Sequence, residues 1–559
     1  MTTRSKIRFK EITSQQSVLF PSNIGDKIRA NHPVRVVDQI VDKLNIDDIL
    51  STYKGGGTSS YHPRVMIKIL FFSYLNNIYS CRKISKQLEE NIYYMWLSGN
   101  STPNFRTINN FRGEKLKGKI QGLFAGFVQL MAEMGYISLD VQYVDGTKIE
   151  AVSNRYTFVW RGSTEKYKEK LETKINSILK DIDKSIEEDK ANEQVEETTP
   201  SINTEILRQK IEELNQRLDQ LNKGQQKQLE KLEQEHLPRL LKYEEQLRIL
   251  GNRNSYSKTD PDATFMRMKE DHMKNGQLKP AYNAQISTEQ QFATNYSIHQ
   301  RPGDTATLTP HLEQFKATYE KQSSTVVADA GYGSEQNYEY CENENIEAFI
   351  KYNYFHKEQK KAYKNNPFLP SNLYYNKIED YLVCPMGQHM NFIGNGNRKS
   401  ELGYEYQVSI YRAENCQGCP MRTQCHKGKN NRIVELNHKL IKYRNQAKKR
   451  LMSRPGLYHR SMRPIEPESV FGQIKFNNKF NRFTLSGLAK VEVEFGLVLL
   501  SHNLRKLAQI MSRMPKKRWF QHFSGLFQQF LANHIKNQGK YQPKIISFYE
   551  HPTKIKLCA

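Results

Sequence analysis

The apolar residues of this chain change their spacing along its length, and these changes divide it into segments. Between residues 32 and 119 the spacing is helical, with Val34, Val37 and Ile40 on one face of a first predicted helix. Residues 65–74 form another predicted helix that is apolar almost all round. The sequence therefore predicts a helical module at its N-terminal end.

A second segment, from about residue 162 to 250, is rich in Glu, Lys, Gln and Asn. Its apolar residues recur at alternating steps of four and three, a spacing typical of a coiled-coil seam. The seam comprises Leu207, Ile211, Leu214, Leu218 and Leu221. We predict two long helices, in an antiparallel hairpin broken near residues 196–200, that project from the core. This insertion would serve association with a partner or a second copy, without a catalytic role.

Runs of β-branched and aromatic residues predict strands around and beyond this insertion. One run begins at Thr325 and ends on Asp329, and another begins at Val141 and ends on Asp145. A carboxylate at a strand end lies at the rim of a sheet, where α/β folds bind their ligands. The further predicted strands are 281–287, 293–299 and 346–352, and the predicted helices are 309–320 and 336–342. The fold class is therefore α/β, with a mixed sheet flanked by helices.

A third acid, Glu468, follows Pro467 in the first turn of a predicted helix that continues to Lys475. Carboxylates from three such elements suit a site for divalent metal ions, since Mg²⁺ and Mn²⁺ prefer oxygen ligands. We predict Asp145, Asp329 and Glu468 as the metal ligands and the catalytic residues.

Simpler interpretations exist for these acids when each is taken alone. Asp145-Gly146 is a common turn signal, and a helix dipole favours an acid such as Glu468 in the first turn. The reserve candidates are Asp140, Asp260 and Asp262.

The net charge of the 559-residue chain is +25, with an isoelectric point near 9.5. Lysines and arginines gain by releasing counterions from phosphates, so we predict a nucleic-acid partner rather than a merely soluble basic protein. The helical module is basic and fits DNA binding, although dimerisation or packing is nearly as good an explanation. No signal peptide or membrane-spanning run is predicted, so the chain is interpreted as intracellular.

Cations also surround the predicted acids. Lys475 lies two turns after Glu468, and Lys475, Lys479 and Arg482 are spaced to form a basic stripe on one helical face or its continuation. The residues predicted to contact DNA are Lys148, Arg463, Lys475, Lys479 and Arg482.

The blocks around Asp145, Asp329 and Glu468 resemble those of the DDE transposases encoded by bacterial insertion sequences. Glu468 and Lys475, with six residues between them, resemble the end of the tyrosine–arginine–glutamate–lysine signature. The arginine of that signature stands four residues before the glutamate, where this chain has Pro464, with Arg463 adjacent; Tyr458 is likewise out of register. The resemblance covers most of residues 30–510.

This resemblance implies a ribonuclease-H-like catalytic core, which also agrees with the predicted order of strands and helices. It implies two Mg²⁺ (or Mn²⁺) ions at the catalytic site, cleavage of double-stranded DNA at the terminal inverted repeats, and strand transfer into target DNA. A homodimer in the DNA complex and a cytoplasmic, nucleoid-associated location are also expected. The alternatives are a ribonuclease-H-like nuclease that does not join strands, and a domesticated DNA-binding protein without catalysis.

Four of the seven cysteines lie close together in the sequence, and related transposases have similar cysteines here. They are Cys384, Cys416, Cys419 and Cys425. Four thiolates suit a closed tetrahedral zinc site, which would be structural, in a small zinc-ribbon-like insertion. Four ordinary thiols are the alternative, and His389 and His426 are spare ligand candidates.

These observations predict a succession of domains. They are an N-terminal helical DNA-binding module (1–118), a catalytic core in two parts (135–161 and 256–352), a long charged helical insertion (162–255), a cysteine-containing insertion (353–435), the final core helices (436–511) and a basic C-terminal tail (512–559).

Overall fold

The structure is a computed structural model that describes residues 23–53, 60–187, 202–218, 221–268 and 276–513. Nearly all of the predicted basic tail, and the predicted break near residues 196–200, lie outside the described residues. Among the described residues, no helix is both long enough and apolar enough to cross a membrane.

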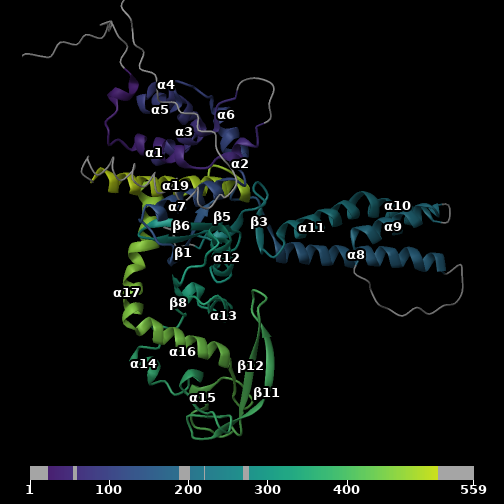
Figure 1. Ribbon diagram of the computed structural model, residues 1–559. Coiled ribbons are helices and arrows are strands. Elements are labelled where there is room, and N and C mark those ends of the chain that lie inside the picture. Colours follow the sequence, from purple (N-terminus) through teal and green to yellow (C-terminus); the bar gives the residue numbers. More distant parts are fainter. Residues whose placement is uncertain (1–22, 54–59, 188–201, 219–220, 269–275, 514–559) are drawn as a thin grey trace, which may run out of the picture.

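The N-terminal segment is helical, as predicted (Figure 1). Its helices are α1 (Pro33–Lys43), α2 (Asp47–Leu50), α3 (Pro63–Leu75), α4 (Cys81–Glu90), α5 (Ile92–Ser98), α6 (Phe105–Asn110) and α7 (Ile120–Glu133), with a 3-10 turn at Ile24–Lys27 and a π-helical turn at Phe111–Lys115. The α3 helix is buried on nearly every side, because it packs against α1, α5 and the long C-terminal helix α19 (Leu488–Ser512).

A mixed sheet forms the centre of the molecule. Its strands are β1 (Val141–Glu150), β4 (Thr264–Arg267), β5 (Leu278–Glu289), β6 (Phe292–His299), β7 (Thr325–Ala328) and β8 (Glu347–Ile350), in the order β4-β5-β1-β7-β8, with β6 also paired to β5. β5 is antiparallel to β1 and to β6, whereas β7 is parallel to β1 and β8 is parallel to β7. The helices α12 (Leu308–Tyr319) and α13 (Glu335–Asn343) connect these last strands.

The α19 helix joins the sheet to the N-terminal helices (Figure 1). It contacts β6 and α7 on one side and α3 on the other, so that one hydrophobic cluster extends from Val34 through Phe292 to Met511. The N-terminal helices are therefore packed against the core rather than tethered to it.

The charged insertion forms an arm that projects from the sheet, as predicted (Figure 1). Two helices run outward, α8 (Arg161–Glu187) and α9 (Thr204–Asn215), and the chain returns through α10 (Lys223–Lys231), a π-helical turn (Leu232–His236) and α11 (Leu237–Leu250). A small sheet of β2 (Phe158–Trp160) and β3 (Ser255–Ser257) closes its base.

The seam of the arm is buried except at one position. Leu207, Ile211, Leu214 and Leu221 lie in its hydrophobic cluster, but the prediction for Leu218 was wrong, since that residue is 41% exposed. The arm also differs from the predicted pair of helices: α9 is a third helix beside α8, and the returning segment runs without a break from α10 through the π-helical turn into α11. A new helix starts at α10 because Asn222 forms a reciprocal capping box with Gln225.

The cysteine-containing segment forms a second, five-stranded sheet. It consists of β9 (Tyr374–Asn376), β10 (Tyr381–Val383), β11 (His389–Lys399), β12 (Glu405–Ala413) and β13 (Ile433–Leu436), with the short helices α14 (Lys361–Lys364) and α15 (Arg422–Cys425) and a 3-10 turn at Pro370–Asn372 nearby. The chain then enters α16 (His438–Met452) and returns to the central sheet.

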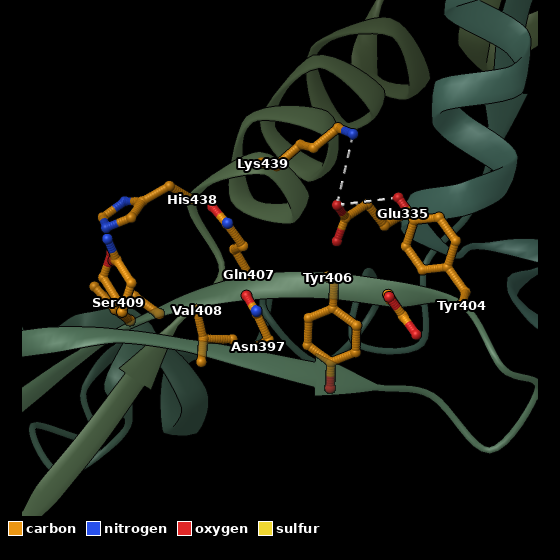
Figure 2. Close-up of a pocket in the computed structure, with 12 residues that line it drawn as sticks. Glu335, Asn397, Tyr404, Tyr406, Gln407, Val408, Ser409, His438 and Lys439 are labelled. Carbon is orange, nitrogen blue, oxygen red and sulfur yellow. Dashed lines mark hydrogen bonds and ion pairs between the residues drawn. The ribbon is translucent and has the colours of Figure 1, made fainter.

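Polar contacts fix the β11–β12 hairpin on α13 and α16 around a hollow of about 580 Å³ (Figure 2). The Tyr404 hydroxyl donates to Glu339 at 2.8 Å, and Lys439 of α16 pairs with Glu339 at 2.5 Å. Asn437 donates its amide to Glu335 at 2.5 Å. The charged side chains that line this hollow are therefore largely paired with one another, and these pairs hold the β11–β12 hairpin, α13 and α16 together.

Candidate active site

The helical segment that contains Glu468 differs from the prediction. We expected Glu468 to open a helix, but α17 (Arg454–Met462) continues through a π-helical turn (Pro464–Glu468) into α18 (Ser469–Gly472) and a second π-helical turn (Gln473–Asn477). The helix starts early because the Ser453 side chain caps it and Pro455 occupies its first turn. Pro464 and Pro467 lack an N–H, and the widened turn accommodates them within the helix.

The two aspartates lie on neighbouring parallel strands. Asp329 directly follows β7, as predicted, whereas Asp145 is in the middle of β1 rather than at its end, because β5 pairs with β1 as far as Glu150. Tyr143 of β1 faces Val327 of β7 in the parallel register. Two residues further along both strands, this register places Asp145 beside Asp329.

Arg463 brings all three predicted acids together. Its Nη2 lies 3.0 Å from Asp145 Oδ1, and its Nη1 lies 3.1 Å from Glu468 Oε1 and 3.6 Å from Asp329 Oδ2. The side chains of Arg463 and Asp145 are 8% and 14% exposed, while Asp329 and Glu468 are about half exposed, at 48% and 50%. The cluster is therefore open to solvent on the side of Asp329 and Glu468.

The π-helical turn explains how Arg463 reaches Glu468 from the position adjacent to the expected one. The two residues are five positions apart in sequence, a spacing that in a regular α-helix would turn their side chains apart. A π-turn has i→i+5 hydrogen bonds, so residues five apart lie on one face. The extra residue in this turn thus compensates for the shift of the arginine. Tyr458, by contrast, is 57% exposed and has no such compensation.

A lysine that the sequence interpretation did not single out also faces the acids. Lys351, directly after β8, lies with its Nζ 3.8 Å from Asp329 Oδ1. Burial lowers its pKa, while the charge of Asp329 acts in the opposite direction. In the sequence, Lys351 could have been recognised by its position one residue after β8, a strand that runs parallel to β7.

The predicted basic stripe does not form. Lys475 is 5% exposed and its Nζ donates to the backbone carbonyl of Lys148 at 2.8 Å. The helix ends at Asn477, and Lys479 adopts a left-handed φ of 55° in the turn that follows. Arg482 donates to the carbonyls of Ala151 and Ser153 at the end of β1. Lys475 and Arg482 therefore hold this segment against β1, although Arg482, like Lys479, is exposed.

Two glycines let the chain pass closely beside the acids. A Cβ on Gly146 would lie 2.2 Å from the Gln285 amide nitrogen and 2.9 Å from Asp304 Oδ1. A Cβ on Gly333 would lie 2.3 Å from the Lys351 carbonyl oxygen, which is backbone and cannot yield. A larger residue at Gly146 would displace the Gln285 and Asp304 side chains, and one at Gly333 would require the backbone to shift.

Asp304 is a nearby acid that sequence reasoning missed. It accepts from Asn283 Nδ2 at 2.8 Å and from Gln285 Nε2 at 3.1 Å, and Gln285 in turn accepts from the Tyr332 hydroxyl. Burial raises the pKa of Tyr332, and the carboxylates around it act in the same direction. Asp304 lies in the loop between β6 and α12, five residues after β6 ends, so it does not directly follow a strand as Asp329 does, and no spacing in the sequence linked it to the site.

The three reserve acids have other partners. Asp140 pairs with Lys321 at 2.6 Å. Asp260 is buried and accepts from the Tyr282 hydroxyl and the Gly487 N–H, and Asp262 accepts from the Leu488 N–H at the start of α19. None of the three contacts the Arg463 cluster among the described residues.

The four clustered cysteines line one small cavity, of about 30 Å³. All are free thiols; the Cys425 sulfur accepts from Arg432 Nη1 at 3.1 Å and the Cys416 sulfur accepts from the Arg432 N–H. His426 is bound to the Asn430 carbonyl. His389 stacks on Tyr381. Within the described ranges, no group of three or more His, Cys, Asp or Glu side chains is arranged to hold a metal ion as it stands.

Two protein-family models match the chain. One, described as Transposase DDE domain, matches residues 383–508, and the other, described as Transposase domain (DUF772), matches residues 22–114. No curated protein matches. The first match includes Arg463, Glu468 and Lys475, whereas Asp145 and Asp329 lie outside both. A transposase domain over the N-terminal helices, with a transposase DDE domain that includes the Glu468 helix, supports a DDE transposase of an insertion sequence.

Proposed function

We propose that this transposase binds the ends of its element, cleaves the DNA there and transfers the cut strands to target DNA, with Asp145, Asp329 and Glu468 as catalytic residues. The observation that supports this proposal is the convergence of three carboxylates, from β1, the end of β7 and the α17–α18 segment, on the single guanidinium of Arg463. Three acids that meet at a solvent-open sheet edge suit metal-assisted phosphodiester chemistry.

We also propose that the central sheet is a ribonuclease-H-like core. The order β6-β5-β1-β7-β8, with antiparallel pairs on one side of β1 and parallel pairs on the other, supports it. The arm between β2 and β3 and the segment between β8 and α16 would then be insertions in that core. The N-terminal helices would be the DNA-binding module.

The donor set fits hard divalent cations. All three side chains offer carboxylate oxygens, and a cationic group already lies between them, which indicates that the cluster accepts positive charge. The residues that would hold Mg²⁺ or Mn²⁺ are therefore Asp145, Asp329 and Glu468. When bound, such ions activate an attacking water or 3′-hydroxyl and stabilise the leaving oxygen.

The chain's own cations would position the DNA. Lys351 and Arg463 lie beside the acids and would hold the reacting phosphate by charge, in a partly buried setting where this interaction is stronger than in water. Lys479 is exposed beyond the Glu468 helix and would contact the DNA backbone, as would Lys148 on β1. Because two element ends must be joined, we propose that the DNA complex contains a homodimer.

We propose in addition a structural zinc site at Cys384, Cys416, Cys419 and Cys425. The four thiols share one cavity between β10, β12 and α15, and sulfur is a preferred donor of Zn²⁺. When bound, the ion would fix the turns at one end of the five-stranded sheet. Arg432, which now donates to two of the sulfurs, would balance thiolate charge.

The test is cleavage of an element-end duplex with Mg²⁺ by the Asp145→Asn, Asp329→Asn and Glu468→Gln variants. Each should lose cleavage and strand transfer while retaining binding of the duplex. Asp140→Asn is the matched control, since Asp140 lies five residues before Asp145 and pairs with Lys321 instead. If a variant of the three cleaves at the wild-type rate, that residue does not belong to the site; cleavage without joining by the wild type would identify a nuclease.

A further inference from the structure

A cleft of about 590 Å³ lies between the N-terminal helices and the segment that leads into α19. It is separate from the carboxylate cluster. One wall comes from α4, α6 and the π-helical turn Phe111–Lys115, and the other from Thr484, Leu485 and Lys490. Its volume is in the range of ligand-binding sites.

An exposed aromatic ring between two arginines lies in this cleft. Phe105 is 36% exposed, and the guanidinium carbons of Arg82 and Arg106 lie 5.3 and 5.9 Å from its ring centroid. Among the described residues, neither arginine side chain has a hydrogen bond or an ion pair with another part of the protein. Their positive charge is therefore available to a ligand that also covers the ring.

The floor of the cleft is a buried arginine. Arg112 is 3% exposed and donates to the Tyr74 hydroxyl, the Tyr79 carbonyl and Asn109 Oδ1, at 3.0, 2.9 and 3.2 Å. Its Nε is buried without a partner in the described structure, although a buried N–H normally has one. Glu494 of α19 lies 3.9 Å beneath it.

The charges of the cleft differ from those of the hollow in Figure 2, which has nearly the same volume. In the hollow, Glu335 and Lys439 are used in contacts between the protein's own elements. In the cleft, Glu114 is neutralised by Lys490 at 2.6 Å, so the two arginines at Phe105 are left as an excess of positive charge. The cleft is thus suited to an anion with a flat ring.

We propose that this cleft binds a nucleotide of an unpaired DNA strand, with its base stacked on Phe105 and its phosphate held by Arg82 and Arg106. An aromatic face beside cations is the usual means of binding single strands, because every base can stack. This inference rests on the proposed function, in which the chain acts on DNA ends. A bound nucleotide would contact both the N-terminal helices and the segment that leads from Glu468 to α19.

The experiment measures binding of a fluorescein-labelled single-stranded 12-mer and of the matching duplex to the full chain, in EDTA. Phe105→Ala should weaken single-strand binding about ten-fold and duplex binding much less. Phe105→Trp, which keeps an aromatic ring at this position, should bind the single strand about as well as the wild type. Arg82→Gln and Arg106→Gln should each weaken single-strand binding and reduce its salt dependence by about one unit. Lys83→Gln is the matched control, because Lys83 is the exposed neighbour of Arg82 that does not line the cleft.

Wild-type single-strand binding by Phe105→Ala would overturn the proposal, as would equal losses for single strand and duplex. Competition by free deoxynucleoside monophosphate distinguishes a site for free nucleotides from one for a strand. If the mononucleotide displaces the 12-mer at equal nucleotide concentration, the strand itself is not recognised and the proposal fails. Binding in EDTA does not depend on cleavage, so a failure of the proposed catalytic function would leave this result unaffected.

Discussion

Arg463 holds the three carboxylates together with a single charge, so its replacement by glutamine should have a measurable cost in stability. Removing one partner of a buried ion pair costs about 3–5 kcal/mol, and an exposed pair is worth about 0.2–1 kcal/mol. Arg463 and Asp145 are mostly buried, whereas Asp329 and Glu468 are about half exposed, at 48% and 50%. We therefore expect Arg463→Gln to lower the free energy of unfolding by about 3 kcal/mol in EDTA.

A divalent cation would compete with Arg463 for the same oxygens, and this gives the prediction its test. Ligand at a hundred times its Kd stabilises a folded protein by about 2.7 kcal/mol. Without the guanidinium, Mg²⁺ meets three carboxylates that repel one another, so the variant should regain most of its loss. The wild type should gain less, because its acids are already neutralised in part.

Urea unfolding followed by circular dichroism, with EDTA or with Mg²⁺, measures these changes. Arg460→Gln is the matched control, because Arg460 lies on the same helix, over the Phe355 ring, and does not contact the acids. The reasoning is refuted if Arg463→Gln is as stable as the wild type in EDTA, or if Mg²⁺ stabilises it no more than it stabilises Arg460→Gln.

Three further predictions concern other parts of the molecule. The purified protein should contain about one zinc ion per chain, and Cys416→Ser/Cys419→Ser should lose it and unfold at a lower temperature, because metal binding contributes to folding; metal analysis and thermal melting measure both. Lys479→Ala should reduce the salt dependence of duplex binding by about one unit, whereas buried Lys475→Ala should leave that slope unchanged and lower stability. Burial lowers the pKa of His311 to about 3, below its ordinary value of 6.5, so the unfolded chain binds the extra proton as the pH falls through 6.5. The free energy of unfolding should therefore fall by about 1.4 kcal/mol for each pH unit between pH 6.5 and 3 because of His311. The His311→Gln variant should show a flatter dependence of stability on pH in this range.

The sequence predicted the elements that depend on local patterns. The β7 strand and Asp329 at its end were predicted correctly, because a short β-branched run bounded by glycine has few other structures. The arm was predicted because its seam has a regular period. Asp145 was expected at a strand end, but β1 continues beyond it to Glu150. The length of β1 depends on its pairing with β5, which no local pattern in the sequence encodes.

The contacts between distant segments could not be predicted from the sequence. Lys475 was expected on a surface, but it is buried against the Lys148 carbonyl, and that contact joins residues 327 positions apart. Lys351 and Asp304 enter the site only through the order of strands and the path of a loop. The position of Arg463 depends on the π-helical turn at Pro464–Glu468. This turn could not be predicted from the two prolines in it, because proline usually ends a helix.

That π-helical turn also determines how the segment tolerates insertion and deletion. A regular helix that gains or loses one residue rotates everything beyond it by about 100°, which would separate an arginine from its glutamate. Here one surplus residue is already stored between Arg463 and Glu468. Deletion of a single residue from 464–467 would convert the turn into regular α-helix and leave the two side chains on the same face. The spacing of this pair can therefore differ by one residue between related chains without loss of their alignment.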